Sequence, residues 1–129
     1  MDLVAVDSSV LIDHFRGRSR TFLNLLALHD AQQIKLMLPV VVIFEIEKGK
    51  EMETVESRDK FYKTISFLER LGISEEVAAL SGEAIRRGKI LSDPLDAFIA
   101  ATAVLSGAKL ATLNHRHFRS FPGLTLYGN

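Results

Sequence analysis

Three acidic residues stand at places where a carboxylate is costly without a partner. Asp7 follows the apolar run "LVAV" at residues 3–6, Glu45 lies within "VVVIFEIEKG", and Asp96 lies within "DPLDAFIAA". A buried carboxylate needs hydrogen bonds or a cation, because its desolvation is unfavourable. Three carboxylates that converge repel one another and raise one another's pKa unless a divalent cation neutralises them. The three residues are therefore candidates for one shared site.

Carboxylate oxygens are hard ligands, and they favour Mg²⁺ or Mn²⁺ over zinc. A Mg²⁺ site of this kind supports phosphodiester hydrolysis, because the metal activates water and stabilises negative charge on the phosphate. Each acid also has an ordinary structural explanation. Asp7 could cap the next helix, Asp96 could interact favourably with a helix dipole, and Glu45 could lie on an amphipathic surface. The metal hypothesis depends on all three meeting at one place.

The stretch "ATLNHRHFRSF" at residues 111–121 holds His115 and His117, two positions apart. A His-x-His pair suggests zinc, but no third nitrogen or sulfur ligand is nearby in sequence and the chain has no cysteine. We therefore expect neither histidine to bind a metal. Phe118 and Phe121 are expected to pack this turn onto the core.

The segments that must position these residues alternate between strands and helices. The apolar pattern predicts strands at 3–6, 35–39, 71–74, 109–113 and 124–127, and helices at 8–15, 19–31, 53–70, 75–88 and 94–106. Pro39 ends the second strand, and a helix is expected soon after it, although the valines at 40–42 disfavour one. This alternation predicts a parallel sheet covered on both faces. Ligands bind such sheets beyond the carboxyl ends of the strands.

Polar residues and glycine mark several helix ends. Ser19, Ser74 and Asp93 are expected to be N-caps, and Pro94 fits the first position of the helix that follows Asp93. Gly107 is expected to end that helix.

Composition sets the broad class of the protein. The chain has 129 residues, of which 47% are hydrophobic, so we expect a single domain over residues 1–129 with a substantial core. The 16 basic and 16 acidic residues give no net charge, but an acidic pocket inside a basic rim also sums to zero. The opening residues lack the pattern of a signal peptide, and no apolar run reaches the roughly 18 residues of a membrane span. A soluble cytoplasmic protein is expected.

Four segments resemble PIN domains, and more closely the VapC-type ribonuclease toxins of bacterial and archaeal toxin–antitoxin pairs. They are "VDSSVLID" at 6–13, "EIEKG" at 45–49, "LDAFIAATA" at 95–103 and "TLNHRHF" at 112–118. The resemblance covers almost the whole chain. It implies a three-layer α/β/α fold around a parallel sheet of about five strands. It also implies Mg²⁺- or Mn²⁺-dependent cleavage of single-stranded RNA, homodimers, and an antitoxin protein whose tail blocks the active-site groove.

The resemblance also implies roles for individual residues. Asp7, Glu45 and Asp96 match the family's acidic positions, which are catalytic and bind the metal. Ser9 matches the small hydroxyl residue that helps hold that site. Thr112, in the last matching segment, is a further supporting candidate.

The last matching segment departs from the family pattern. Asn114 stands where many relatives have Asp, and His117 stands where others have a later Asp. Asn114 offers a neutral oxygen and two amide donors, so it could hold a metal-bound water or orient a carboxylate. A second metal ion would have fewer acidic ligands. Basic residues at the rim, with Arg16, Arg86 and Arg116 as candidates, would neutralise RNA phosphates.

Two other functions stay open. A catalytically depleted PIN-like binding module would be recognised by a partner without cleaving RNA. The absent fourth acid favours this module, and the three retained acids oppose it. A Mg-dependent phosphatase-type α/β enzyme would use an Asp after the first strand as nucleophile. Haloacid-dehalogenase-type phosphatases have Asp-x-Asp there, whereas this chain has Asp7-x-Ser9.

Overall fold

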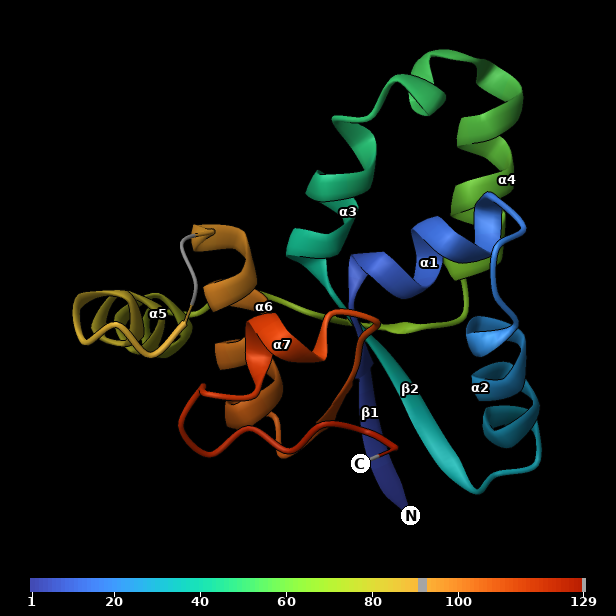
Figure 1. Cartoon of the computed structure of the whole chain (residues 1–129). Coiled ribbons are helices and arrows are strands. Elements are labelled where there is room, and N and C mark those ends of the chain that lie inside the picture. Colours follow the sequence, from blue (N-terminus) through green and yellow to red (C-terminus); the bar gives the residue numbers. More distant parts are fainter. Residues whose placement is uncertain (91–92, 129) are drawn as a thin grey trace.

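Four parallel strands form the sheet at the centre of the molecule (Figure 1). The computed structural model describes residues 1–90 and 93–128. In these residues the strand order is β3-β2-β1-β4. The strands are β1 (Asp2–Val6), β2 (Ile34–Pro39), β3 (Glu69–Leu71) and β4 (Lys109–Ala111).

Helices flank this sheet on two sides. In Figure 1, α1, α2 and α4 lie to the right of β1 and β2, whereas α6 and α7 lie to the left, with α5 outside α6. The arrangement confirms the predicted α/β/α layers. The helices are α1 (Ser8–Phe15), α2 (Thr21–Asp30), α3 (Val40–Glu47), the 3₁₀ helix η1 (Lys50–Glu53), α4 (Val55–Ile65), α5 (Glu75–Arg86), α6 (Pro94–Leu105) and α7 (His115–Phe118).

Burial explains why these segments fold as they do. Val4, Ala5 and Val6 of β1 are fully buried, as expected for a parallel strand covered on both faces. Helix α6 buries Ala97, Ile99, Ala100, Ala101, Thr102 and Ala103, so it passes through the interior rather than along the surface. The small side chains let it pack closely between α5 and the sheet.

The helix predicted after Pro39 is present as α3. It begins at Val40, directly after β2, despite the low helix propensity of three successive valines. Val41 and Val42 are buried, so tertiary packing outweighs local preference. This helix matters because it carries Glu45.

The sheet differs slightly from the prediction of about five strands. Residues 124–127 form no fifth strand and make only an isolated parallel bridge, between Leu126 and Leu110. The predicted helix at 53–70 ends at Ile65, and β3 lies at Glu69–Leu71 instead of 71–74. Arg70 explains the early end: its guanidinium donates to the carbonyl oxygens of Ile65 at 2.7 Å and Leu68 at 2.5 Å.

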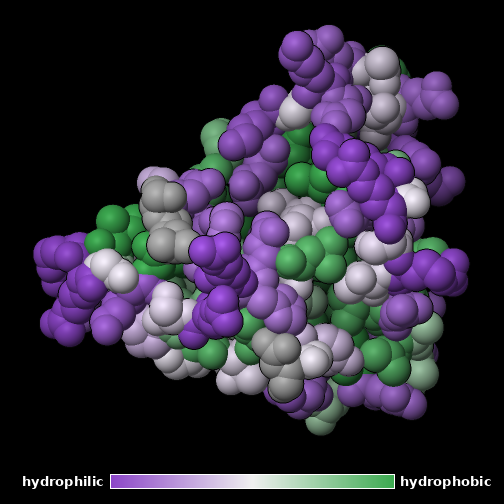
Figure 2. Space-filling model, in the orientation of Figure 1, coloured by the Kyte–Doolittle hydropathy of each residue, from purple (hydrophilic) through white to green (hydrophobic). Residues whose placement is uncertain are grey.

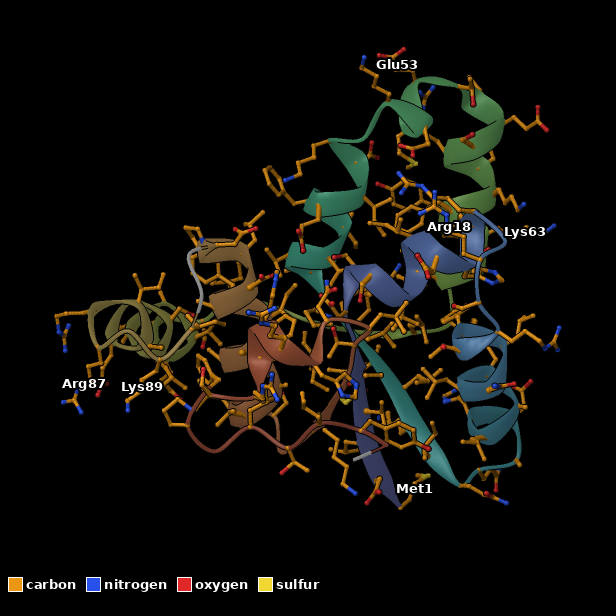
Figure 3. All side chains as sticks on the ribbon, viewed as in Figure 1. Met1, Arg18, Glu53, Lys63, Arg87 and Lys89 are labelled. Carbon is orange, nitrogen blue, oxygen red and sulfur yellow. The ribbon has the colours of Figure 1, made fainter. Side chains whose placement is uncertain are left out.

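Surface character agrees with this layout. Figure 3 shows Glu53, Lys63, Arg87 and Lys89 at the periphery, with their side chains pointing outward. None of the described helices is long and apolar enough to cross a membrane. A single domain over residues 1–129 stays a prediction.

Two of the three predicted N-caps are present. The Ser74 hydroxyl accepts a hydrogen bond from Val77 N at 3.1 Å, and the Asp93 carboxylate accepts one from Leu95 N at 2.9 Å. The Ser19 prediction is wrong, because α2 begins at Thr21 with Arg20 as its N-cap. The Ser19 hydroxyl is buried without a partner among the described residues. Gly107 follows α6 with φ of 69°, as a terminating glycine should.

These caps predict opposite effects for two similar substitutions. Ser74→Ala should lower the free energy of unfolding by about 1 kcal/mol, because α5 loses its cap. Ser19→Ala should leave it unchanged or raise it slightly, since a buried unpaired hydroxyl is removed. Urea denaturation of both variants and the unsubstituted protein measures the difference. Equal losses in the two variants would contradict this assignment of caps.

Candidate active site

The structure brings the three predicted acids together. Asp7, Glu45 and Asp96 each contribute one carboxylate oxygen to a group of three, and these oxygens all lie within 4.8 Å of one another. Asp7 directly follows β1, Glu45 lies on α3 after β2, and Asp96 is in the first turn of α6. The group therefore assembles beyond the carboxyl ends of the two central strands, where parallel sheets bind ligands.

Asp7 is held by hydroxyl groups rather than used as a helix cap. It occupies the N-cap position of α1, but its side chain makes no capping hydrogen bond. Instead its Oδ2 accepts hydrogen bonds from Ser9 Oγ and Thr112 Oγ1, both at 2.7 Å. The residue is only 2% exposed, so these two donors replace water around a buried carboxylate. The predicted supporting roles of Ser9 and Thr112 agree with these contacts.

The hydroxyls of Ser9 and Thr112 also fix the chain that follows β4. Leu113 N donates to Ser9 Oγ at 3.0 Å, and Asn114 N donates to Thr112 Oγ1 at 3.0 Å. Each hydroxyl therefore donates to Asp7 and accepts from the backbone. The result is a continuous hydrogen-bonded connection between the ends of β1 and β4.

Glu45 is connected to Asp7 through a residue that the sequence did not single out. Ser8 Oγ lies 3.1 Å from Glu45 Oε1 and 3.5 Å from Asp7 Oδ1. Burial raises the pKa of Glu45, and the nearby charges of Asp7, Asp96 and Asp93 raise it further, against a lowering by the Ser8 hydrogen bond. Ser8 stands beside Asp7 in a Ser-Ser pair, and that adjacency was its only signal in the sequence.

Asp96 lies opposite a histidine. His117 Nδ1, on α7, is 3.4 Å from Asp96 Oδ2. Burial raises the pKa of Asp96, and the charges of Asp7 and Asp93 add to this, while His117 lowers it. Asp93 thus contributes negative charge to the site as well as capping α6. Burial is thus the main cause of the raised pKa of both Glu45 and Asp96, and the neighbouring carboxylates add to it.

The remaining predicted site residues lie around this group. Asn114 is exposed and is the N-cap residue of α7, with no capping hydrogen bond from its side chain. Arg116 is exposed on the same short helix. Arg16 NH2 pairs with Glu51 Oε1 at 2.6 Å. Arg86 is the exposed last residue of α5, in the outer helix, and the structure does not bring it to the carboxylates.

The segment after β4 forms the short helix α7 where a turn was predicted. Its histidines are not part of the group of possible metal-binding side chains found among the described residues. Phe118 and Phe121 are buried, at 0% and 2% exposed. This confirms the prediction that they pack the segment against the core.

Crowded carboxylates should cost stability when no cation is present. Glu45→Gln is expected to raise the free energy of unfolding at neutral pH, by less than about 1 kcal/mol because solvent screens part of the repulsion. The pKa of native Glu45 is raised, so the native state disfavours its ionised form. This cost is complete above the raised pKa and disappears as the pH falls below the ordinary glutamate pKa of about 4.3.

Urea denaturation in EDTA, at neutral pH and near pH 4, tests this expectation. The gain should be present at neutral pH and absent at pH 4. Glu47→Gln is the matched control on the same helix, because Glu47 is exposed and bonds to the Tyr62 hydroxyl instead. An equal gain from the control would contradict the assignment to the carboxylate group.

Known proteins resemble this chain over nearly its full length. A family model for the PIN domain matches residues 4–124. Ribonuclease VapC19 of Mycobacterium tuberculosis is 28% identical over 122 residues, covering 92% of this chain and 94% of that protein. Among solved structures, DNA-bound VapBC from Salmonella typhimurium has a TM-score of 0.80 at 21% identity, covering 98% of this chain and 97% of that one. A toxin–antitoxin complex from Klebsiella pneumoniae has a TM-score of 0.73 at 25% identity, covering 95% of each chain. Because the family match spans most of its length, the chain belongs to the PIN domain family.

Proposed function

We propose that this protein is a metal-dependent endoribonuclease that cleaves single-stranded RNA and acts as the toxin of a type II toxin–antitoxin pair. The observation that carries the proposal is the meeting of Asp7, Glu45 and Asp96 within 4.8 Å of one another. They come from three different elements of the fold. The likeness to a protein named as a ribonuclease, over 92% of the chain, supports the same activity.

The donor set fits a hard divalent cation, Mg²⁺ or Mn²⁺. Two oxygens that bind one Mg²⁺ at about 2.1 Å lie at most roughly 4.2 Å apart. The observed oxygens lie within 4.8 Å, so small side-chain movements close the site. All three donors are carboxylate oxygens, which Mg²⁺ and Mn²⁺ prefer and zinc does not. Asp7, Glu45 and Asp96 would hold the cation.

The residues of the chain have distinct tasks in this mechanism. A bound cation supplies Lewis acidity, which activates water and stabilises charge on the phosphate. Asp7 is held in place by hydrogen bonds from Ser9 and Thr112. Glu45, from α3, is less buried than Asp7 and would be the carboxylate that accepts a proton from attacking water. Asp96 completes the group from α6.

Basic residues near the site supply contacts to the RNA backbone. Arg116 is exposed on α7, which also carries His117 beside Asp96, so it is the strongest candidate to neutralise a neighbouring phosphate. Arg16 is bonded to Glu51 and would have to exchange that partner for a phosphate. Arg86, on the outer helix, would contact only RNA that extends beyond the site.

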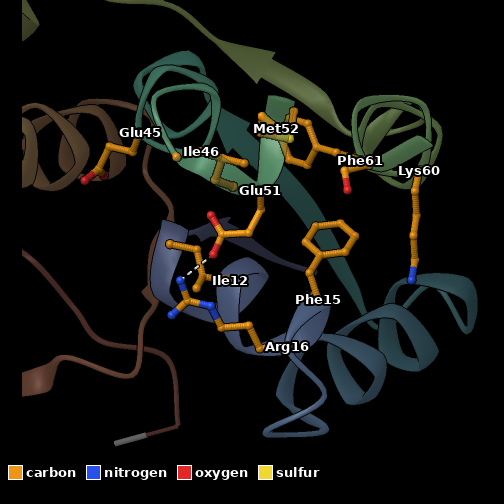
Figure 4. A pocket seen from close by; sticks show the side chains of 11 residues that line it. Ile12, Phe15, Arg16, Glu45, Ile46, Glu51, Met52, Lys60 and Phe61 are labelled. Carbon is orange, nitrogen blue, oxygen red and sulfur yellow. Dashed lines mark hydrogen bonds and ion pairs between the residues drawn. The ribbon is translucent and has the colours of Figure 1, made fainter. Parts of the chain in front are cut away.

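A groove next to Glu45 fits the tail of an antitoxin. It lies between α1, α3, η1 and α4 and has a volume of about 280 Å³ (Figure 4). Figure 2 shows hydrophobic surface between α1 and α3, framed by hydrophilic side chains. The groove is lined by Ile12, Phe15, Arg16, Glu45, Ile46, Gly49, Glu51, Met52, Ser57, Lys60 and Phe61. A partner segment with an apolar side chain and a charged neighbour would match this lining and cover Glu45.

Solved structures support an antitoxin as the occupant. The neighbours include complexes described as VapBC and as toxin–antitoxin, some of them bound to DNA. We further propose a homodimer, because α2, α4 and the turn after α4 expose several large apolar side chains. These are Leu23 (38%), Val55 (64%), Tyr62 (39%) and Phe67 (49%). A cytoplasmic location and one domain over residues 1–129 complete the proposal.

The alternatives differ in testable ways. An inert binding module is favoured by the exposed Asn114, because an acid is absent there. It does not explain why three carboxylates that repel one another lie together. A haloacid-dehalogenase-type phosphatase that used Asp7 as nucleophile would have a second Asp two positions later. This chain has Ser9 there, and the Ser9 hydroxyl donates to Asp7 Oδ2.

Removal of any one acid should abolish RNA cleavage. Asp7→Asn and Asp96→Asn should each lower the rate by at least about 10²-fold, the usual loss when one electrostatic group is removed from an active site. EDTA should stop cleavage, and added Mn²⁺ or Mg²⁺ should restore it. The measurement is cleavage of a labelled single-stranded RNA at neutral pH.

Glu47→Gln serves as the control for this assay, because Glu47 lies on the same helix as Glu45 but outside the carboxylate group. It should cleave RNA at the unsubstituted rate. Cleavage that survives Asp7→Asn, Asp96→Asn or complete chelation would refute the proposed mechanism. A protein that binds neither Mn²⁺ nor Mg²⁺ would favour the inert module.

A substitution that fills the groove should weaken antitoxin binding. Ser57→Trp places a bulky ring in the groove, away from the carboxylates, and should weaken binding of the antitoxin at least about tenfold, or 1.4 kcal/mol. Ser66→Trp is the matched control, since Ser66 lies at the other end of α4, outside the groove. Calorimetric titration with the cognate antitoxin, to be sought in the reading frame beside that of this chain, gives both affinities. Equal affinities for the two variants would place the antitoxin elsewhere.

A further inference from the structure

His117 is the one basic side chain found against the carboxylate group among the described residues. Its Nδ1 lies 3.4 Å from Asp96 Oδ2, and its side chain is 49% exposed, whereas that of Asp96 is 15% exposed. The proposed mechanism assigns no task to this contact.

The backbone around His117 is restrained from both sides. Next to it, Phe118 is fully buried and anchors α7 to the core. On the other side, the backbone amide of His117 donates to Asn114 O at 3.0 Å. The amide of Asn114 in turn donates to Thr112 Oγ1 at 3.0 Å. Because Thr112 also donates to Asp7, one short segment reaches two of the three acids.

Asp96 needs such a partner more than Asp7 does. Asp7 has two hydroxyl donors at 2.7 Å. His117 contacts Asp96 through its imidazole nitrogen, while Asp7 and Asp93 place like charge near it. Without a donor, repulsion favours rotation of the Asp96 side chain away from the group. A group that contacts a metal ligand fixes its orientation and raises the affinity for the metal.

We propose that His117 is the positioning residue for Asp96, and that its Nδ1–H holds the carboxylate in the orientation that binds the cation. The inference rests on the proposed function, because it concerns the same site. It differs from the zinc hypothesis, since His117 acts through Asp96 and does not touch the cation. It also differs from an RNA-contacting role, because that role would leave metal binding unchanged.

Calorimetric titration with Mn²⁺ at neutral pH tests the proposal without any RNA. His117→Ala should weaken Mn²⁺ binding by about tenfold, the lower end of the effect of losing such a partner. His117→Asn should keep affinity within about threefold of the unsubstituted protein. The asparagine amide nitrogen takes the place of Nδ1 and donates without a charge. Arg119→Gln, just beyond α7, removes a nearby charge and should leave the affinity unchanged.

Two further measurements separate positioning from folding and from RNA binding. The metal-free melting temperature of His117→Ala should equal that of the unsubstituted protein, because the histidine is half exposed. At limiting Mn²⁺ and over a range of RNA concentrations, the variant should lose kcat with little change in KM for RNA. A loss confined to KM would assign His117 to RNA contact and overturn the proposal.

The outcomes also distinguish this inference from the proposed function. If the unsubstituted protein binds no Mn²⁺, the metal site fails and His117 has no carboxylate ligand to position. If it binds Mn²⁺ but His117→Ala binds equally well or more tightly, only the role of His117 is overturned. The same holds if His117→Asn is as weak as His117→Ala, because the hydrogen-bond donor then has no effect.

Discussion

The two hydrogen bonds to Asp7 Oδ2 are the interaction on which the site depends. Asp7 is almost completely buried after the central strand β1, and a carboxylate there is unfavourable unless donors replace its water. One donor, Ser9, comes from α1, and the other, Thr112, comes from the residue after β4. The same hydroxyls accept from the backbone of residues 113 and 114. Fixing the charge therefore also fixes the chain that follows β4.

The other acids are placed by elements that pack for reasons of their own. Helix α3 buries Val41, Val42 and Ile46, which leaves Glu45 at the side facing α1 and α6. Helix α6 is buried along most of its length, so its first turn, with Asp96, is held at the edge of the sheet. Apolar packing thus supplies the free energy that keeps three like charges together. This is the usual relation between a stable scaffold and a strained functional site.

Sequence reasoning predicted what depends on pattern and local chemistry. The alternation of strands and helices, the caps at Ser74 and Asp93, and the convergence of three acids all follow from hydrophobic periodicity and from the rule that ligands bind at strand carboxyl ends. It failed where long-range contacts decide. Arg70 bonds to the carbonyl oxygen of Ile65, the last residue of α4, and to that of Leu68 beyond it, and residues 124–127 form only one bridge. Ser8 and His117 acquire their roles through contacts with residues 37 and 21 positions away, respectively.

The pairing of β1 with β4 has a consequence for synthesis of the chain. Asp7 is made at the start, whereas its second donor, Thr112, follows 105 positions later. Strand β4 is an edge strand that docks beside a strand formed from the first residues. A nascent or truncated chain that stops before β4 has Asp7, but it lacks both β4 and the Thr112 hydroxyl that donates the second hydrogen bond to Asp7. The second hydrogen bond to Asp7 therefore forms only after Thr112 has been made, and a chain that stops after Asp96 but before Thr112 has all three acids without it.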